Sequence, residues 1–296
     1  MRKIKNLNQK GFTLVELLVC LFLSMLIVAL LCQTIIVNNN LYSADIVRTS
    51  LNQDLKNAMA IISADVKEAG ENLAKNFPAV ELRQDATLGT SILTIRRNML
   101  DEILKVCEPI AKGSTVSEIK FSLAGTTSGC IYSDNIYNFD VWKQYRLQHG
   151  NIAYPFIYDM AENKGEFFTY KGESDTSAEH SLIVNSFSAS NDYNVGASAM
   201  YMVEEWQFFL QDGFLVLIEN GQTHNPKKII NNVKKFLVNI ETEDGVVHDT
   251  FLPESGDMWS DIATIHITIG NEKSFMKKMV EKELSASFYP RNILSH

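Results

Sequence analysis

The chain has 296 residues, of which 46% are hydrophobic and 21% are charged, and its formal net charge is −8. This length and balance exclude a small disulfide-stapled scaffold, a disordered chain and a collagen, and the acidic balance argues against nucleic-acid binding through a basic surface. A mean hydropathy of −0.06 excludes a protein that crosses a membrane many times. The hydrophobic residues are nevertheless distributed very unevenly along the chain.

Residues 1–11 carry four basic residues and no acidic residue, and the apolar run that follows, residues 12–37, has Glu16 as its only charge. At about 1.5 Å per residue this run forms a helix about 39 Å long, which is enough to cross a bilayer. The basic flank favours a cytoplasmic N-terminus and an exported remainder. The run is too long for the apolar part of a secretory signal peptide, and no small-residue cleavage site follows it. We therefore expect a retained transmembrane helix.

Glu16 is the unusual residue of this run, because a carboxylate within a membrane span costs roughly 2.5–3.5 kcal/mol unless it finds a partner. The segment Gly11–Glu16 (GFTLVE), placed after a basic leader, resembles the prepilin-type signal of type IV pilins and type II secretion pseudopilins. The resemblance implies that a membrane prepilin peptidase cleaves between Gly11 and Phe12 and that Phe12 is then N-methylated. It also implies that Glu16 pairs with the α-amino group of a neighbouring subunit during assembly.

Cleavage at this place has a simple electrostatic consequence. Removal of the four basic leader residues from a chain of net charge −8 leaves −12, and one new α-ammonium group forms at the edge of the membrane. Glu16 lies about one helical turn from that group and is a suitable partner for it. A plain signal anchor with an accidental match is the alternative interpretation.

A second helical pattern follows in residues 38–70. Its apolar residues recur every three or four positions and lie within one stripe about 100° wide. They are Val47, Leu51, Leu55, Ala58, Ile62, Val66 and Ala69. Gly70 is a candidate C-cap, and Pro78 prevents continuation of the helix. The pattern predicts one long helix over residues 12–70, whose second half docks on a globular head, as the resemblance to pilins also implies.

Residues 71–296 are expected to form the exported head, and from Ala79 onward the pattern changes to short strands separated by turn signals. The expected strands are Ser91–Arg96, Glu102–Val106, Ser117–Leu123, Gly165–Tyr170, Ser181–Ser186, Tyr201–Leu210, Phe214–Glu219, Val233–Glu241, Ile262–Ile269 and Leu284–Tyr289. Asp212-Gly213 predicts a tight hairpin, and the polar segment Gly172–Ser198 predicts a long loop. The expected fold class is α+β and pilin-like: a long N-terminal helix packed on an antiparallel, β-rich head.

The last third of the chain also resembles the heads of two kinds of large minor subunit, the PilW-type minor pilins and the J-type pseudopilins. The resemblance depends on two strands joined at Asp212-Gly213, on later strands within Ile229–Val238 and Trp259–Ile269, and on the terminal pair Arg291-Asn292.

Four cysteines fall into two groups. Cys107 and Cys130 lie in the exported part, where an oxidising compartment favours a disulfide between them, and two separate buried thiols are the alternative. Cys20 and Cys32 lie in the apolar run and are interpreted as small packing residues.

Sequence motifs for catalysis, phosphate binding and dinucleotide binding are absent, and the six histidines have no metal-ligand spacing. We therefore predict no catalytic residue, no cofactor and no metal, and a protein that is not an enzyme. Two acidic groups are interpreted as solvated loops, with Ca²⁺ binding as the alternative. They are Glu241, Glu243, Asp244 and Asp249, and Glu254, Asp257 and Asp261.

Two groups of lysines are interpreted as solvated faces balanced by nearby acids. They are Lys227, Lys228, Lys234 and Lys235, and Lys273, Lys277, Lys278 and Lys282. Contact with DNA phosphates is the alternative if the filament takes up DNA, but no nucleic-acid partner is predicted directly. Aromatic residues are frequent between positions 132 and 158 and predict core packing, and an exposed subset of them would suit a protein interface.

These features together predict a minor subunit of a type IV pilus, at the tip or in a priming complex, that supports assembly and thereby adhesion, twitching motility or DNA uptake. A J-type minor pseudopilin of a type II secretion system is the first alternative, and a signal-anchored periplasmic enzyme or binding protein is the second. The expected partners are the prepilin peptidase, the major pilin, other minor pilins or pseudopilins, and the inner membrane. The head is expected in the periplasm and later at the filament tip on the cell surface.

Overall fold

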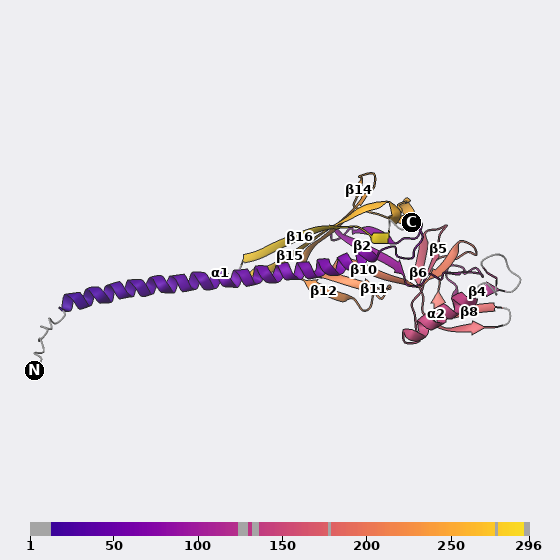
Figure 1. The fold of residues 1–296 in the computed structure, drawn as a ribbon, viewed down its shortest axis with the longest axis horizontal. Coiled ribbons are helices and arrows are strands. Elements are labelled where there is room, and N and C mark those ends of the chain that lie inside the picture. The colour runs from indigo at the N-terminus through magenta and orange to yellow at the C-terminus, as the bar shows by residue number, and fades with distance from the viewer. Residues whose placement is uncertain (1–12, 124–129, 132–135, 177–178, 276–277, 293–296) are drawn as a thin grey trace, which may run out of the picture.

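The computed structural model describes residues 13–123, 130–131, 136–176, 179–275 and 278–292. Its longest element is the 55-residue helix α1, Leu14–Glu68, whose first half stands clear of the head while its second half lies along it (Figure 1). The predicted apolar stripe is buried from Leu51 to Ala69, and Val47 is partly buried. The long helix on a β-rich head is therefore confirmed.

The end of α1 depends on a glycine. Ala69 is the C-cap, and Gly70 has φ +77°, a conformation that L side chains rarely adopt. A Cβ atom at Gly70 would also lie 2.3 Å from the indole ring of Trp259, which covers this turn. Trp259 Nε1 donates a hydrogen bond of 3.1 Å to the carbonyl oxygen of Ala74, so the close approach fixes the chain as it leaves the helix.

Two antiparallel sheets form the main head. The first has the order β1 (Val80–Asp85), β2 (Thr90–Asn98), β10 (Val203–Gln211), β11 (Phe214–Glu219) and β12 (Lys227–Asn231). The second has the order β14 (Val247–His248), β13 (Val233–Thr242), β15 (Ile262–Phe275) and β16 (Lys278–Phe288). The short 3₁₀ turns Pro253–Ser255 and Trp259–Asp261 lead into β15. Helix α1 lies against β15 and β16 on one side and β12 and β2 on the other, and all three layers share one apolar core.

The chain between β2 and β10 forms a second lobe at the end of the head farthest from the N-terminus, which we call the distal lobe (residues 99–202; Figure 1). One sheet has the order β3 (Leu104–Lys105), β9 (Ser198–Tyr201), β5 (Phe156–Asp159) and β6 (Lys164–Phe167). Another has the order β4 (Thr115–Leu123), β8 (Glu179–Ser188) and β7 (Tyr170–Asp175), and helix α2 spans Ile136–Gln148. The lobe is an insertion, because β2 and β10 pair directly, with Asn98 opposite Val203.

The sheet containing β5 and β9 separates two apolar cores. Phe156 and Tyr158 of β5 face the core of the main head, whereas Ile157 between them faces the core of the distal lobe. This follows from the two-residue alternation of side chains along a strand. The distal lobe is therefore joined to the main head through a shared layer.

Several sequence expectations for the head were wrong in detail. The expected strand Gly165–Tyr170 is divided between β6 and β7, and the expected strand Tyr201–Leu210 between β9 and β10. The expected loop Gly172–Ser198 largely forms the β7–β8 hairpin, because Leu182 and Val184 bury apolar side chains in the core of the distal lobe. The hairpin at Asp212-Gly213 is confirmed between β10 and β11, with φ angles of +51° and +75°.

Candidate functional site

The N-terminal end of α1 is built by two polar residues. Thr13 is the N-cap, and its side-chain oxygen accepts a hydrogen bond of 3.3 Å from the backbone N–H of Glu16. In return, Glu16 Oε2 accepts bonds of 2.9 Å from the backbone N–H of Thr13 and 3.0 Å from its hydroxyl group. This reciprocal capping box satisfies backbone donors that the first helical turn leaves unpaired. Thr13 was not among the predicted site residues, although threonine three positions before glutamate is the sequence signature of this cap.

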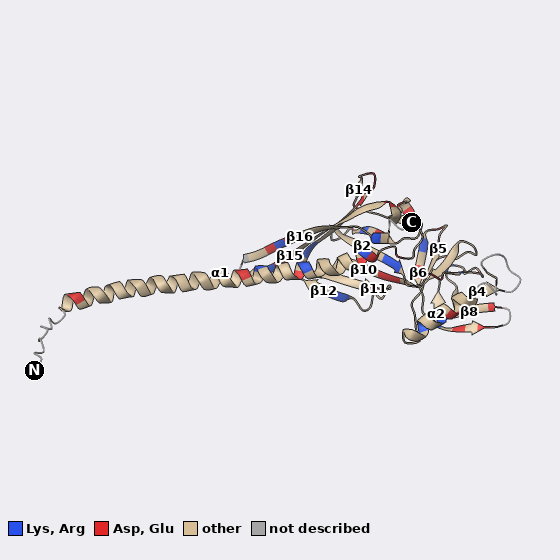
Figure 2. Ribbon diagram, viewed as in Figure 1, with Lys and Arg blue, Asp and Glu red and all other residues tan. Residues whose placement is uncertain are grey.

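The surroundings of this cap are apolar and uncovered. Leu14 is 80% exposed, and the large apolar side chains along the first half of α1 are all exposed in the isolated chain. Figure 2 shows this half of α1 almost free of charged residues. Among the described residues, α1 is the one helix that is long and apolar enough to cross a membrane. Such a surface is stable only in lipid or against other apolar helices.

The Glu16 carboxylate keeps capacity for a second partner. Both bonds from Thr13 go to Oε2, and Oε1 accepts no hydrogen bond from any described residue. An ionised carboxylate can accept about four hydrogen bonds. The cap therefore holds the carboxylate at the end of the helix while Oε1 remains open to a donor from another molecule. The predicted cleavage and methylation residues, Gly11 and Phe12, lie outside the described residues.

Comparison with family models gives a match for the prokaryotic N-terminal methylation motif over residues 6–31. The motif indicates a type IV pilin-like or pseudopilin protein. It implies processing by a prepilin peptidase and assembly with other pilins. Together with the apolar helix α1, it indicates a protein anchored in the inner membrane. Neither the curated proteins nor the solved structures give a match to the chain.

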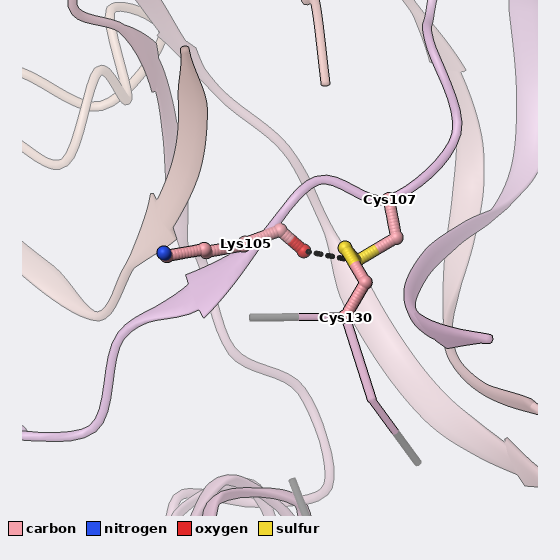
Figure 3. Close-up of a disulfide and its surroundings, with 3 residues drawn as sticks. All are labelled: Lys105, Cys107 and Cys130. Carbon is pink, nitrogen blue, oxygen red and sulfur yellow. Dashed lines mark hydrogen bonds between the residues drawn. A yellow bond between two sulfur atoms is a disulfide. The ribbon is translucent and has the colours of Figure 1, made fainter. Parts of the chain in front are cut away.

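The head contains a disulfide between Cys107 and Cys130, with the two Cα atoms 5.8 Å apart (Figure 3). Cys107 Sγ lies 3.6 Å from the carbonyl oxygen of Lys105, a contact without a donated proton, because a disulfide sulfur carries none. The bond joins the segment after β3 to the chain that follows β4, within the distal lobe. Cys20 and Cys32, by contrast, are free and exposed on the apolar half of α1.

Two residues of the acidic groups in the head, Asp244 and Asp257, organise turns. Asp244 Oδ1 accepts hydrogen bonds from the Thr242 hydroxyl group at 2.6 Å and the Val246 backbone at 3.3 Å, and Asp257 Oδ2 accepts one of 2.8 Å from the Leu252 backbone. Over residues 13–292, excepting the undescribed gaps, no group of three or more His, Cys, Asp or Glu residues could hold a metal ion. The hydrogen bonds therefore account for these carboxylates as turn-forming residues.

Two adjacent arginines of β2 form ion clusters that the sequence analysis missed. Arg96 is buried, donates hydrogen bonds of 2.5 Å to Glu81 and 2.7 Å to Glu205, and lies over the ring of Phe156 in β5. Burial by itself would raise the pKa of Glu81, but Arg96 and Arg83 hold it below its usual value. The cluster therefore links β2 to its neighbours β1 and β10, and the contact with Phe156 joins it to β5 in the sheet shared with the distal lobe.

Arg97 points to the opposite face of β2. Its guanidinium group donates to Glu68 at the end of α1 and, at 2.7 Å, to Glu204 of β10, and it stacks over the indole ring of Trp206. It therefore links the end of the helix to the first sheet. No short motif marks either arginine, because the partners of each lie on separate elements.

The aromatic cluster predicted between positions 132 and 158 is only partly buried. Phe139, Trp142, Phe156 and Tyr158 lie in the cores, whereas Tyr137 and Tyr154 are exposed. Core packing therefore holds for these four residues, whereas Tyr137 and Tyr154 form an exposed subset, and Tyr132 lies outside the described residues.

Proposed function

We propose that this chain is a non-enzymatic minor subunit of a type IV pilus that acts at the filament tip or in the complex that primes assembly. The observation that carries the proposal is the construction of α1: a fully exposed apolar half that ends in a single carboxylate, Glu16, held by its own N-cap. This end suits transfer from lipid into a bundle of similar helices, because both surroundings are apolar and both leave the carboxylate in need of a cationic partner.

In the proposed mechanism, Glu16 acts after the leader has been removed. The α-ammonium group of a neighbouring subunit pairs with the carboxylate through Oε1, while Thr13 continues to hold Oε2. The pair neutralises two charges in an apolar environment, where an unpaired charge is costly. Because the contact can form at only one position along the two helices, it also sets the axial register between them.

The size of the head supports a tip or priming role over that of a major subunit. The distal lobe adds a second core and a helix at the end of the head opposite the apolar half of α1 (Figure 1). In a homopolymer, every repeat would have to accommodate this bulk against its neighbours. A subunit that is present once, at an end, has no such restriction. From this position the protein would support pilus assembly and thereby adhesion, motility or DNA uptake.

The decisive experiment compares carboxylate variants in the native bacterium. Glu16→Gln and Glu16→Ala should insert into the inner membrane and be processed, yet be absent from sheared filaments in immunoblots. Asp45→Asn is the matched control, because it removes an exposed carboxylate from the same helix outside the apolar run. Normal incorporation of both Glu16 variants would refute the pairing role, as would equal loss of the Asp45→Asn variant.

Deletion of the gene separates the pilus proposal from its alternatives. The proposal expects loss of surface pili with protein secretion unchanged. Loss of secretion with intact pili would instead identify a J-type pseudopilin. If a Gly11→Val variant that escapes leader cleavage restores full function to the deletion strain, the chain acts as a membrane-anchored enzyme or binding protein.

A further inference from the structure

We infer that the outer part of the β15–β16 hairpin, at the described residues Lys273, Phe275, Val280 and Lys282, is a docking surface for anionic phospholipid headgroups, which it contacts while α1 still spans the membrane; we call these residues and their strand neighbours the hairpin tip. The tip lies beside α1, its charges are sorted onto two faces, and the rest of the chain is acidic.

The hairpin is the part of the head that lies nearest to the apolar half of α1. Figure 1 shows β15 and β16 running beside α1 and reaching further back toward the N-terminus than the other labelled strands. The apolar run ends at Val37, and the first partly covered residues of α1 are Ser43 and Ala44. Six residues of helix measure about 9 Å. A headgroup layer occupies roughly 5–8 Å on each side of the hydrocarbon core, so the tip meets the outer edge of this layer.

The strand register sorts the charges of the tip onto two faces. Asn271 pairs with Lys282, and Lys273 pairs with Val280, so these four residues lie on one face of the hairpin. Further along the strands, the same face carries Ile265, Ile267 and Ile269 into the core that α1 shares. The basic face of the tip is thus a continuation of the face that holds α1.

The opposite face carries the acids. Gly270, Glu272 and Ser274 alternate with the basic face, and the register places Glu281 and Glu283 beside them. Two of these three carboxylates already have partners: Glu272 binds Lys234 at 3.0 Å and Glu283 binds Lys235 at 3.1 Å. The negative charge of this face is therefore largely compensated within the head.

The lysines of the basic face lack such compensation. Lys273 and Lys282 are exposed, and neither forms an ion pair with any residue that the structure describes. Phe275 and Val280, partly buried on the same face, add apolar surface next to them. On α1, the exposed charges at this height, Asp45 and Arg48, lie 3.8 Å apart and pair with each other. Free lysines beside apolar side chains are the composition that membrane interfaces select.

The position of the tip along α1 and its positive charge identify the partner as an anionic lipid headgroup. The tip lies within about one Debye length, 8 Å at physiological ionic strength, of the lipid phosphates on the side of the inner membrane that faces the head. After leader cleavage, a chain of net charge −12 is repelled by an anionic surface. Among the described residues, Lys273 and Lys282 place uncompensated positive charge at the part of the head that lies nearest to the bilayer. Contact there would hold the head upright over the membrane and would be released when the subunit leaves the bilayer.

The test uses the full-length protein in nanodiscs of phosphatidylcholine alone or of phosphatidylcholine mixed with phosphatidylglycerol. Hydrogen–deuterium exchange is followed in peptides that cover residues 269–284. We expect slower exchange of the hairpin tip in the anionic nanodiscs, by about fivefold for each lysine that contacts the surface, which corresponds to about 1 kcal/mol. High salt should abolish the difference.

Matched double variants assign the effect to the basic face. Lys273→Gln combined with Lys282→Gln should exchange equally fast in both lipid compositions. Lys112→Gln combined with Lys171→Gln removes the same charge from exposed positions in the distal lobe and should keep the lipid dependence. Unchanged exchange in peptides of β10 and β13 shows that both double variants are folded.

Equal exchange of the wild-type tip in the two lipid compositions would overturn the inference, as would persistence of the lipid effect in the Lys273/Lys282 variant. Protection that appears only after another subunit is added would assign the basic face to an acidic protein surface. None of these outcomes depends on filament assembly, so the inference and the proposed function can fail separately.

Discussion

Replacement of Arg96 by leucine is expected to be among the most damaging single substitutions in the head. The Arg96 side chain is 8% exposed, and its guanidinium group donates three bonds: to Glu81 Oε1 at 2.5 Å, to Glu205 Oε2 at 2.7 Å and to the Pro78 carbonyl oxygen at 2.7 Å. Leucine removes all three donors. Glu81 keeps Arg83 at 3.3 Å, but the buried carboxylate of Glu205 is left without a cation.

The expected loss of stability follows from the carboxylate that Arg96→Leu leaves unpaired. Breaking a buried ion pair by removing one partner costs about 3–5 kcal/mol, because the remaining charge stays desolvated. Arg83 provides the matched control: it also binds Glu81, but it is half exposed and its second contact, Glu254, is 3.4 Å away and exposed. Arg83→Leu should therefore cost no more than about 1 kcal/mol. Arg96→Leu combined with Glu205→Gln should recover part of the loss, because the orphaned charge is removed.

The assay is urea unfolding of the full-length protein in detergent, followed by the fluorescence of Trp206 and Trp259 in the main head. The free energy of unfolding is compared between the variants at constant pH and salt. If Arg96→Leu costs no more than Arg83→Leu, or if the added Glu205→Gln change gives no recovery, the cluster does not stabilise the head in the way described.

The remaining predictions use the same assay. Cys107→Ser combined with Cys130→Ser should lower stability by about 3 kcal/mol, because it releases a chain loop closed across 23 positions; an unchanged midpoint in reductant would contradict this. Burial lowers the pKa of His180, which is stacked on Phe139 with ring centroids 4.7 Å apart, and the facing Asp175 and Asp140 oppose the shift only in part. Because the folded pKa is below the unfolded value near 6.5, stability should fall as pH drops below about 6.5, and His180→Phe should flatten this slope. Burial, with Glu68 and Glu204 nearby, raises the pKa of Asp65 to about 7. Stability should therefore fall as pH rises from about 4 to 7, and Asp65→Asn should be more stable than wild type at pH 8 but not at pH 4.

The parts of the structure that could be predicted from sequence are those written in local patterns. The stripe that ends at Ala69 follows the period of a helix, and the turn at Asp212-Gly213 carries residues that tolerate positive φ angles. The segment Gly11–Glu16 is equally local, since the residues that carry the prepilin-type signal are adjacent in the chain. In each case the physical cause lies within a few residues of its effect.

Helix α2 shows why other elements were not predicted from the sequence. Its buried residues are Phe139, Trp142 and Arg146, so one position of its inward face is a charged residue. Arg146 is accommodated by a two-bond contact with Glu173 of β7, at 2.7 and 2.8 Å. A hydrophobic pattern cannot reveal a face that depends on a partner brought near only by folding. The same holds for Arg96, whose partners come from β1 and β10.

The full length of the β15–β16 hairpin was not predicted, because its outer residues are polar. The predicted strand ended at Ile269, where the apolar residues stop, but the ladder continues to Phe275 opposite Lys278. The outer part of the hairpin extends beyond the core, so its residues are polar although their backbone hydrogen bonds are those of the inner part. Backbone pairing, unlike burial, leaves little trace in side-chain type.

The way in which the distal lobe is inserted determines how it can act. Asn98 and Val203 pair across β2 and β10, so the lobe stands where a simple turn would otherwise join these strands. Helix α1 docks on the sheets of the main head rather than on the lobe. The lobe can therefore vary without disturbing the docking of the helix. It is nevertheless not a flexible appendage, because β5 buries Phe156 in one core and Ile157 in the other, and Arg96 lies over Phe156. The end of α1 and the distal lobe are thus connected through a continuous packed layer.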